Sequence, residues 1–216
     1  NAAVAEAEVA EKEIDETRAK YIPVAARGSI LFFCIADLAM VDPMYQYSLS
    51  YFQQLFKYCI DVSEKADSVP SRLQILMDYI SYFVYLQVSR GLFAQHRLVF
   101  SFLICTAIMR HSSSIHDSEW NFLLRGCGAQ TGKLELGPCP NVPWLTAKSW
   151  ELLNGLQRLI PARFDGFVTN FEQLLEEWGA WAASPAPHTV QLPGMWGDDA
   201  EDNEKFLPGF SQMLIL

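Results

Sequence analysis

The sequence is poor in basic residues, with 16 Lys and Arg against 25 Asp and Glu among its 216 residues and a formal net charge of −9. Broad contact with nucleic acid needs a basic face, so this charge argues against that class of partner. Long apolar runs are also missing, since Ile30 to Val41 and Leu98 to Met109 are shorter than the roughly 18 residues of a membrane helix. The sequence therefore predicts a soluble protein without a nucleic-acid or membrane partner.

Paired cysteines are missing as well. The five cysteines are an odd number without a CxxC pair, and three of them lie in apolar helical runs, where cysteine acts as a small hydrophobe. This pattern favours a reducing compartment. The Glu-rich start has no secretory or transit signal, and the apolar end "GFSQMLIL" resembles a buried strand that has been cut. We therefore expect a piece of a longer chain.

An intact nucleotide-binding loop is missing. The stretch "GCGAQTGK" places Lys133 after a glycine-rich run, but the P-loop pattern requires a glycine where Cys127 stands and a Ser or Thr where Leu134 stands. Upstream, "DSEWNFLLRG" predicts a short helix capped at Asp117 or Ser118 rather than a buried strand. We interpret the stretch as a loop between helices, and a nucleotide-binding enzyme that uses Lys133 as a weaker alternative.

Metal-binding and catalytic patterns are weak. Four residues have the nitrogen and sulfur donors that zinc prefers: His111, His116, Cys127 and Cys139. Their spacing fits structural zinc sites poorly. His96 lies in an apolar helical segment without a nucleophile motif, so we interpret it as a core or surface histidine. We interpret two acidic groups as solvated surface: Glu172, Glu176 and Glu177, and residues 198–204. The first group is not interpreted as a pair of catalytic carboxylates, nor the second as a calcium-binding loop. The residues alone identify no catalytic, cofactor-binding or metal site.

Residues 1–20 are strong helix formers and predict a long exposed helix. Its less polar residues recur at alternating spacings of four and three, namely Ala3, Ala7, Ala10, Ile14, Thr17 and Tyr21. Such a thin heptad-like seam suits contact with one partner helix, and a solvated surface helix is the alternative. Pro23 is expected to end or kink this helix.

Further helices are expected along the rest of the chain. Residues 30–41 predict a buried helix that Asp42-Pro43 stops, and residues 44–60 predict an amphipathic helix with Tyr45, Phe52, Leu55, Phe56 and Cys59 on one face. A helix capped by Ser68 ends near Gly91, and the next, from Leu92, is apolar on both faces and predicts central burial. Two more helices follow Thr146 and Pro161, and residues 184–208 predict a loop with an acidic cluster.

Several segments carry a specific resemblance. The stretch "ETRAKYIPVAARGSILFFCIADLAMVDPMYQYSLSYFQQLF", residues 16–56, contains the series Arg18, Tyr21, Pro23, Val24 and Ala25, then Met44 to Leu49, then Phe52, Leu55 and Phe56. This series closely resembles dynein heavy chains, just past the microtubule-binding stalk, where the fifth AAA+ module ends. "SRGLFAQHRLVFSF" and "EWNFLLRG" resemble the family's next segments, although Ala94 and Arg97 replace its usual acidic residue and lysine. Later segments match more loosely, and the details are closer to ciliary and flagellar dyneins than to the cytoplasmic form.

The resemblance implies an all-α fold: a helical AAA+ small (lid-type) subdomain with a long protruding helix, followed by the helical start of the next module. It implies three ranges: residues 1–68 as the fifth module's small domain with its strut, or buttress, helix; 69–140 as a connector; and 141–216 as the start of the sixth module with a Pro-rich acidic insertion. The family's working ATP and Mg²⁺ sites lie in other modules, so no cofactor is expected here. The family works at microtubules in the axoneme of cilia and flagella.

The resemblance also implies a function. The segment is expected to be a non-catalytic coupling element that relays movements of the motor ring to the stalk coiled coil, its intramolecular partner. The residues expected to carry packing and coupling are Ile14, Tyr21, Pro23, Phe32, Phe33, Pro43, Met44, Tyr45, Tyr47, Phe52 and Phe56. The alternative is a self-contained helical adaptor that binds a partner through residues 1–20.

Overall fold

The computed structural model describes residues 11–12, 14–16, 18–128, 137–194 and 207–216. Every regular element in these ranges is helical, which confirms the predicted all-α class. The chain divides into two compact units, Asn1–Ser112 and Ser113–Leu216. Each unit has its own hydrophobic core.

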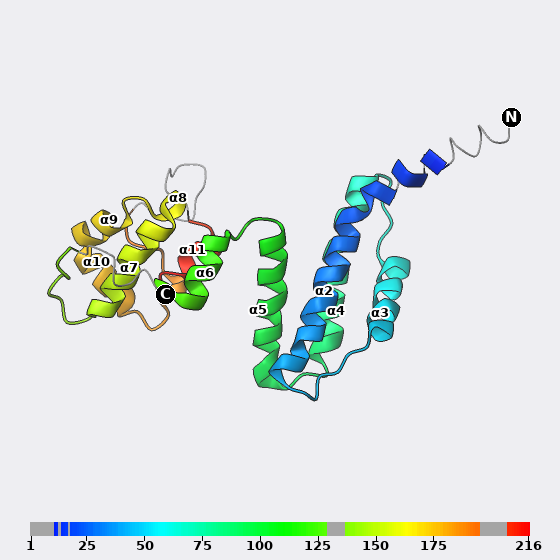
Figure 1. Ribbon diagram of the computed structural model, residues 1–216, viewed down its shortest axis with the longest axis horizontal. Helices are drawn as coiled ribbons and strands as arrows, with labels where there is room; N and C mark the ends of the chain where they lie inside the picture. Colours follow the sequence, from blue (N-terminus) through cyan, green and yellow to red (C-terminus); the bar gives the residue numbers. More distant parts are fainter. Residues whose placement is uncertain (1–10, 13, 17, 129–136, 195–206) are drawn as a thin grey trace. The chain divides into compact units, whose positions relative to one another are not determined.

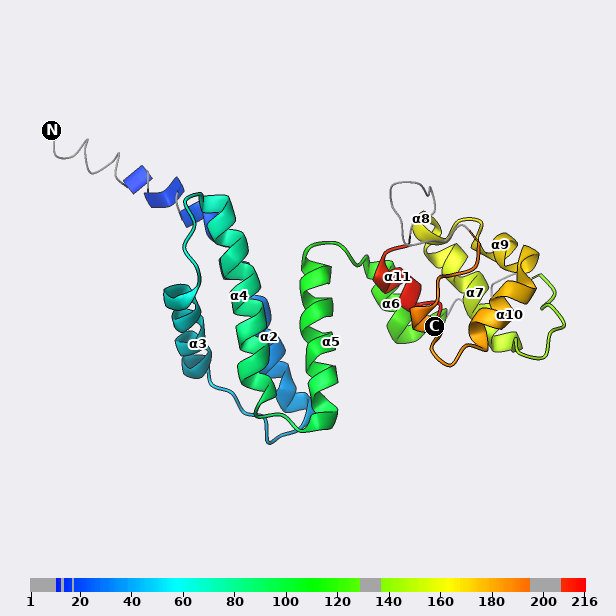
Figure 2. The ribbon, with the colours of Figure 1, turned by 180° about the vertical axis from the view of Figure 1, so that it is seen from behind.

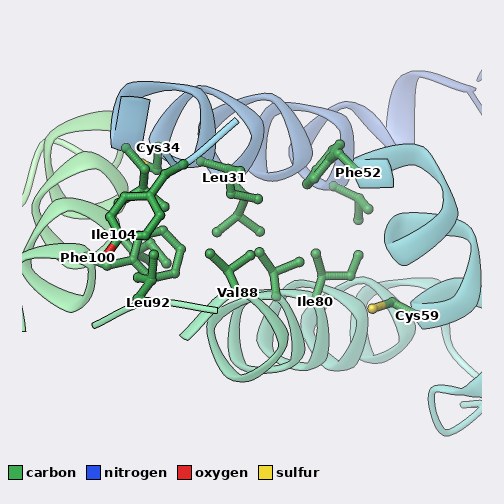
Figure 3. Packing of buried hydrophobic residues seen from close by; sticks show 14 of the residues in the cluster. Leu31, Cys34, Phe52, Cys59, Ile80, Val88, Leu92, Phe100 and Ile104 are labelled. Carbon is green, nitrogen blue, oxygen red and sulfur yellow. The ribbon is translucent and has the colours of Figure 1, made fainter. Parts of the chain in front are cut away.

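Unit 1 is built around the helix α2 (Ile22–Val41), which contacts α3 (Leu49–Val62), α4 (Val69–Ser89) and α5 (Ala94–His111). Both views place α2 against α4, with α3 and α5 on opposite sides of that pair (Figures 1 and 2). Side chains from all four helices meet in one core, in which Leu31 of α2, Ile80 of α4 and Phe100 of α5 are fully buried (Figure 3). Burial of this apolar surface stabilises the unit.

Helix α2 is longer than the apolar run that predicted it, because it begins at Ile22. By length and composition alone it is apolar enough to cross a membrane, a property that the expected helix over residues 30–41 did not have. The central helix of a water-soluble domain passes the same test. Because Leu31, Ile35 and Leu38 are buried within unit 1, we describe α2 as the helix that the other three share.

The ends of the helices in unit 1 follow local sequence signals. Ser68 caps α4 by accepting a hydrogen bond from the Ser71 amide at 3.3 Å, as predicted. Asp42 ends α2 in an extended conformation, which confirms the predicted stop. Helix α3 begins only at Leu49, capped by Ser48, so the prediction of a helix from residue 44 was wrong. Local capping by Ser48 determines this start, and Tyr45 lies in the loop before it.

Unit 2 contains shorter helices, which pack around an aromatic core. They are α6 (Asp117–Arg125), α7 (Ala147–Leu159), α8 (Pro161–Phe164), α9 (Phe167–Gln173), α10 (Leu175–Ala182), the 3₁₀ turn η2 (Pro187–Thr189) and α11 (Gly209–Met213). The core includes Trp150, Phe164, Phe167, Phe171 and Trp178, of which Phe164 and Phe167 are fully buried. Phe167 and Trp178 meet edge to face with ring centroids 5.5 Å apart.

Three sequence expectations for unit 2 need correction. The helix after Pro161 is broken into α8, α9 and α10, because Gly166 has φ +77° and Leu174 leaves helical geometry. Helix α6 is capped at His116 rather than Asp117 or Ser118, since the Glu119 carboxylate accepts from the His116 amide at 2.9 Å. The last apolar run forms the helix α11 and not a strand. The predicted Thr146 cap of α7 is confirmed, with the Ser149 amide 3.0 Å from its hydroxyl.

The two compact units do not follow the three ranges expected from the sequence. Helix α4, which was placed in a connector over residues 69–140, packs with α2, α3 and α5 inside unit 1. The two units divide after residue 112, whereas the expected ranges divide after residues 68 and 140. The assignment of ranges 1–68, 69–140 and 141–216 to particular modules stays a prediction.

Candidate functional site

The residues expected to couple this segment to a partner begin in the N-terminal helix. Residues 11–12, 14–16 and 18–20 are helical, and Arg18 forms an ion pair with Asp15 at 3.1 Å. Ile14 is 52% exposed and Tyr21 is 39% exposed, so unit 1 leaves both seam residues accessible to a partner. The other predicted seam positions, Ala3, Ala7, Ala10 and Thr17, lie outside the described residues.

The seam has the same register as the buried side of α2. From Ile14 to Tyr21 is one heptad, and the alternating spacing of three and four continues through Val24, Gly28, Leu31, Ile35 and Leu38. All five of those residues are buried in unit 1, whereas Ile14 and Tyr21 are not. A sustained a/d pattern marks the side of a helix that packs against other helices. The N-terminal helix therefore extends this pattern beyond the part that unit 1 itself covers.

Pro23 separates the N-terminal helix from α2. It lies in the first turn of α2, where backbone amides have no partner within the helix, so the missing N–H of proline costs no hydrogen bond. Tyr21 forms a turn before it. The amides of Val24 and Ala25 both bond to the Tyr21 carbonyl at 3.1 Å. The prediction that Pro23 ends or kinks the first helix is thus confirmed, and a turn at Tyr21 separates the exposed segment from the packed one.

Four of the predicted aromatic residues lie together where α2 meets α3 and the loop before it. Phe32 of α2 contacts Phe52 of α3 at a centroid distance of 5.5 Å, and Phe52 contacts Phe56 at 6.0 Å. Gly28 allows this close approach, because a Cβ there would lie 2.7 Å from the Phe56 ring. Tyr47 packs on the same core. These residues therefore fix α3 against α2.

Tyr45 is buried, and its hydroxyl makes two hydrogen bonds to the start of α5. It is 3% exposed, its hydroxyl lies 2.8 Å from Nδ1 of His96, and it accepts a hydrogen bond from the Phe93 amide at 3.0 Å. His96 also meets the Tyr45 ring edge to face at 5.6 Å. The loop before α3 is thereby tied to the first turn of α5. No pattern in the sequence indicates that His96 and Tyr45 are partners, because 51 residues separate them.

The remaining predicted residues lie on the surface. Phe33 is 62% exposed and Met44 is 63% exposed, and both Pro23 and Pro43 are exposed as well. They do not join the buried aromatic group, although Phe33 touches Phe32 at a centroid distance of 5.7 Å. Their part in coupling stays a prediction, as does that of the other predicted residues.

The rejected chemical sites find no support in the described residues. Lys133 and its loop lie outside those residues. No group of three or more His, Cys, Asp or Glu side chains within described ranges could hold a metal ion. The zinc candidate Cys127 is buried and its Sγ lies 3.7 Å from the Glu151 carbonyl, while Cys139 is exposed. Burial, followed by the charge of Glu151, raises the pKa of the Cys127 thiol and disfavours the thiolate that zinc binds.

Known proteins resemble the chain over most of its length. Dynein axonemal heavy chain 1 of Rattus norvegicus is 43% identical over 201 residues, which are 93% of this chain and 4% of that protein. Dynein axonemal heavy chain 6 of Homo sapiens is 43% identical over 76% of this chain, and the Chlamydomonas reinhardtii dynein-1-beta heavy chain of the flagellar inner arm I1 complex is 34% identical over 96%. The chain spans 4 or 5% of the length of such relatives. No protein-family model matches it.

Proposed function

Because the chain is homologous over nearly all of its length to one segment of the axonemal dynein heavy chains, we propose that it is part of such a heavy chain. The complete polypeptide is then a microtubule motor of a cilium or flagellum, driven by ATP that binds in other modules. The identities of 34% to 43% over segments covering up to 96% of the chain support this proposal. The names of the relatives, axonemal and flagellar, support the location.

Within that heavy chain, the segment is a non-catalytic mechanical element. Its N-terminal helix acts as a strut that contacts the stalk coiled coil, and unit 1 holds the base of the strut. The observation that carries this proposal is the single heptad register that runs from the exposed Ile14 and Tyr21 into the buried residues of α2. Because the seam continues into the packed core, a displacement of the N-terminal helix can pass across the Tyr21 turn to α2 and unit 1.

A substitution in the seam tests this role. Ile14→Asp in the complete heavy chain places a charge where the strut meets its partner helix. We expect ATP turnover to persist while its stimulation by microtubules falls several-fold, as measured in microtubule-stimulated ATPase and co-sedimentation assays. Ala19→Asp is the matched control, because residue 19 is exposed and lies opposite the seam in the heptad. Equal coupling in the two variants would refute the strut role.

The self-contained adaptor remains the competing function, and the length of the natural polypeptide decides between them. An antibody against residues 141–160 should detect a polypeptide of heavy-chain size in isolated axonemes. A band near the 24.4 kDa of the present chain would favour the adaptor.

A further inference from the structure

The outward side of α5 carries an apolar stripe. Leu98, Phe102, Cys105 and Met109 follow each other at spacings of four, three and four, and we call these residues the α5 stripe. Leu98 is 79% exposed, Phe102 is 38% exposed, Cys105 is exposed and Met109 is half-buried. The core side of the same helix carries Phe100 and Ile104 (Figure 3). The prediction that α5 is centrally buried was therefore wrong for this unit, because one side of the helix is covered and the other is not.

The spacing of the α5 stripe is that of a helix-packing seam. The twelve residues from Leu98 to Met109 include no charged side chain, so no charge within this segment offsets the cost of exposing the apolar stripe to water. Contiguous exposed apolar surface of this kind marks a contact with another protein surface. The regular spacing along a straight helix indicates that the occupant is also a helix.

The charges of α5 define the occupant further. In a chain of net charge −9, this helix contains no Asp or Glu, and exposed Arg97 and Arg110 flank the two ends of the stripe. Complementary charges at such positions select the partner and its orientation. A second copy of α5 would bring arginine toward arginine and is disfavoured, whereas a helix with acidic residues beside its apolar seam is favoured.

We propose that the α5 stripe is the docking face for one α-helix of the same heavy chain, outside these 216 residues, that carries apolar residues at heptad spacing flanked by Asp or Glu. The inference rests on the proposed function, since it takes the occupant from the rest of the heavy chain. The length of that remainder supports the choice, because the present chain spans only 4 or 5% of its relatives. The docking helix would hold unit 1 in place while the strut contacts the stalk.

Cys105 lies in the α5 stripe and reports whether it is covered. The native heavy chain is treated with iodoacetamide, and alkylation of Cys105 is followed by mass spectrometry against the urea-unfolded chain. We expect alkylation in the native protein to be slower by at least about ten-fold, as for a site that must open before it reacts. The fully buried Cys59 serves as an internal reference for an intact unit 1. Reaction of Cys105 at the unfolded rate, with Cys59 protected, would overturn the inference.

A charge in the stripe should displace the occupant. Leu98→Glu should restore rapid alkylation of Cys105, and Gln95→Glu, which adds the same charge at an exposed polar position of α5, should not. Because Leu98 is largely exposed in unit 1, the substitution should leave Cys59 protected. Equal protection of Cys105 in both variants would count against the stripe as the contact.

A photo-crosslinking amino acid, p-benzoylphenylalanine, incorporated in place of Phe102 of the α5 stripe identifies the occupant without reaction of Cys105. We expect a crosslink to an acidic, heptad-patterned segment of the same heavy chain. A crosslink to another polypeptide, to a second copy or within the 216 residues would overturn the inference. A polypeptide far shorter than a heavy chain would instead refute the proposed function, so the two failures are distinguishable.

Discussion

Arg72, in the first turns of α4, holds the end of α3. Its guanidinium donates to the carbonyl of Ile60 at 2.9 Å and to the carbonyl and hydroxyl of Ser63 at 3.1 and 2.9 Å, and it also bonds to the Glu64 carbonyl. The last carbonyls of a helix have no partner within the helix. One side chain therefore satisfies the end of α3 and fixes the loop to α4.

Removing this side chain should destabilise unit 1. Arg72→Met keeps the aliphatic stem but leaves the carbonyls without their donor, and we expect the free energy of unfolding to fall by about 2 kcal/mol. Urea denaturation followed by circular dichroism measures the change. Arg90→Met is the control, because the only hydrogen bond described for the guanidinium of exposed Arg90 goes to the Gln87 side chain. The substitution should cost about 0.5 kcal/mol or less. Similar losses in both variants would contradict this account.

The buried thiols of Cys34 and Cys59 make stability depend on pH. Burial, followed by the charge of Asp37, raises the pKa of Cys34 to about 11, and burial raises the pKa of Cys59 to about 11, against 9.0 for an ordinary thiol. The unfolded chain therefore loses these protons at lower pH than the folded chain. The contribution to stability is complete below about pH 9 and is lost as pH rises toward 11.

This dependence predicts a steeper alkaline fall in stability for the wild type than for the double variant Cys34→Ala, Cys59→Ala. Urea midpoints measured between pH 8 and 11 give the two slopes. The double variant starts from lower stability because its core has lost two sulfur atoms, so the slopes are compared and not the midpoints. Cys105→Ala, which removes an exposed thiol, should fall in parallel with the wild type.

At the scale of the elements, Gly155 shows why α7 can lie against the chain that follows α6. A Cβ at Gly155 would stand 2.2 Å from Sγ of the buried Cys127 and 3.4 Å from the Phe122 ring. The absence of a side chain in the middle of α7 thus makes room for the thiol. Glycine costs helix stability at this position, and the close packing offsets that cost.

Gly155→Ala should overpack this contact and lower the free energy of unfolding by about 1–3 kcal/mol. Adding Cys127→Ala removes the sulfur and should recover part of the loss, so that the double variant is more stable than the sum of the single effects predicts. Thermal denaturation of the four proteins in the cycle measures the coupling. Additive effects would show that the two residues do not restrict each other. Gly209→Ala, where a Cβ would meet nothing within 4 Å, controls for the alanine itself.

Local signals in the sequence predicted elements better than their packing. The caps at Ser68 and Thr146, the stop at Asp42 and the break at Pro23 were all predictable, because each depends on one or two neighbouring residues. The exposed side of α5 was not, since an apolar residue looks the same whether this unit or another surface covers it. The bond between Tyr45 and His96 was also out of reach, because only the fold brings them together.

The predicted coupling residues show the same limit. Phe32, Tyr47, Phe52 and Phe56 belong to the packed core of unit 1, whereas Phe33 is 62% exposed although it is the neighbour of Phe32. Helical periodicity places adjacent residues about 100° apart around the axis. A family resemblance names both residues, and only the structure separates the one that packs from the one that faces outward.

At the scale of the whole molecule, the two hydrophobic cores share no residue. Phe164→Ala removes a fully buried ring from the core of unit 2 and should lower the stability of that unit by about 3–5 kcal/mol. Hydrogen exchange measured by mass spectrometry should then show faster exchange in α7 and α9, with unchanged protection in α2 and α4. The reciprocal variant, Ile80→Ala, should affect the helices of unit 1 alone. Loss of protection in both units from either substitution would show that they unfold together.

The contact between Glu119 and Ser211 limits when unit 2 can fold during synthesis. Glu119 in α6 is 1% exposed, and its carboxylate accepts hydrogen bonds from the His116 amide and from the hydroxyl of the fully buried Ser211 in α11. A buried carboxylate requires such partners. During synthesis the ribosome must therefore add 92 further residues after Glu119 before its second partner exists. Residues 1–112 of unit 1 have all been synthesised by then, so we expect unit 1 to fold before unit 2. The core of unit 2 can be completed only after α11 has left the ribosomal tunnel.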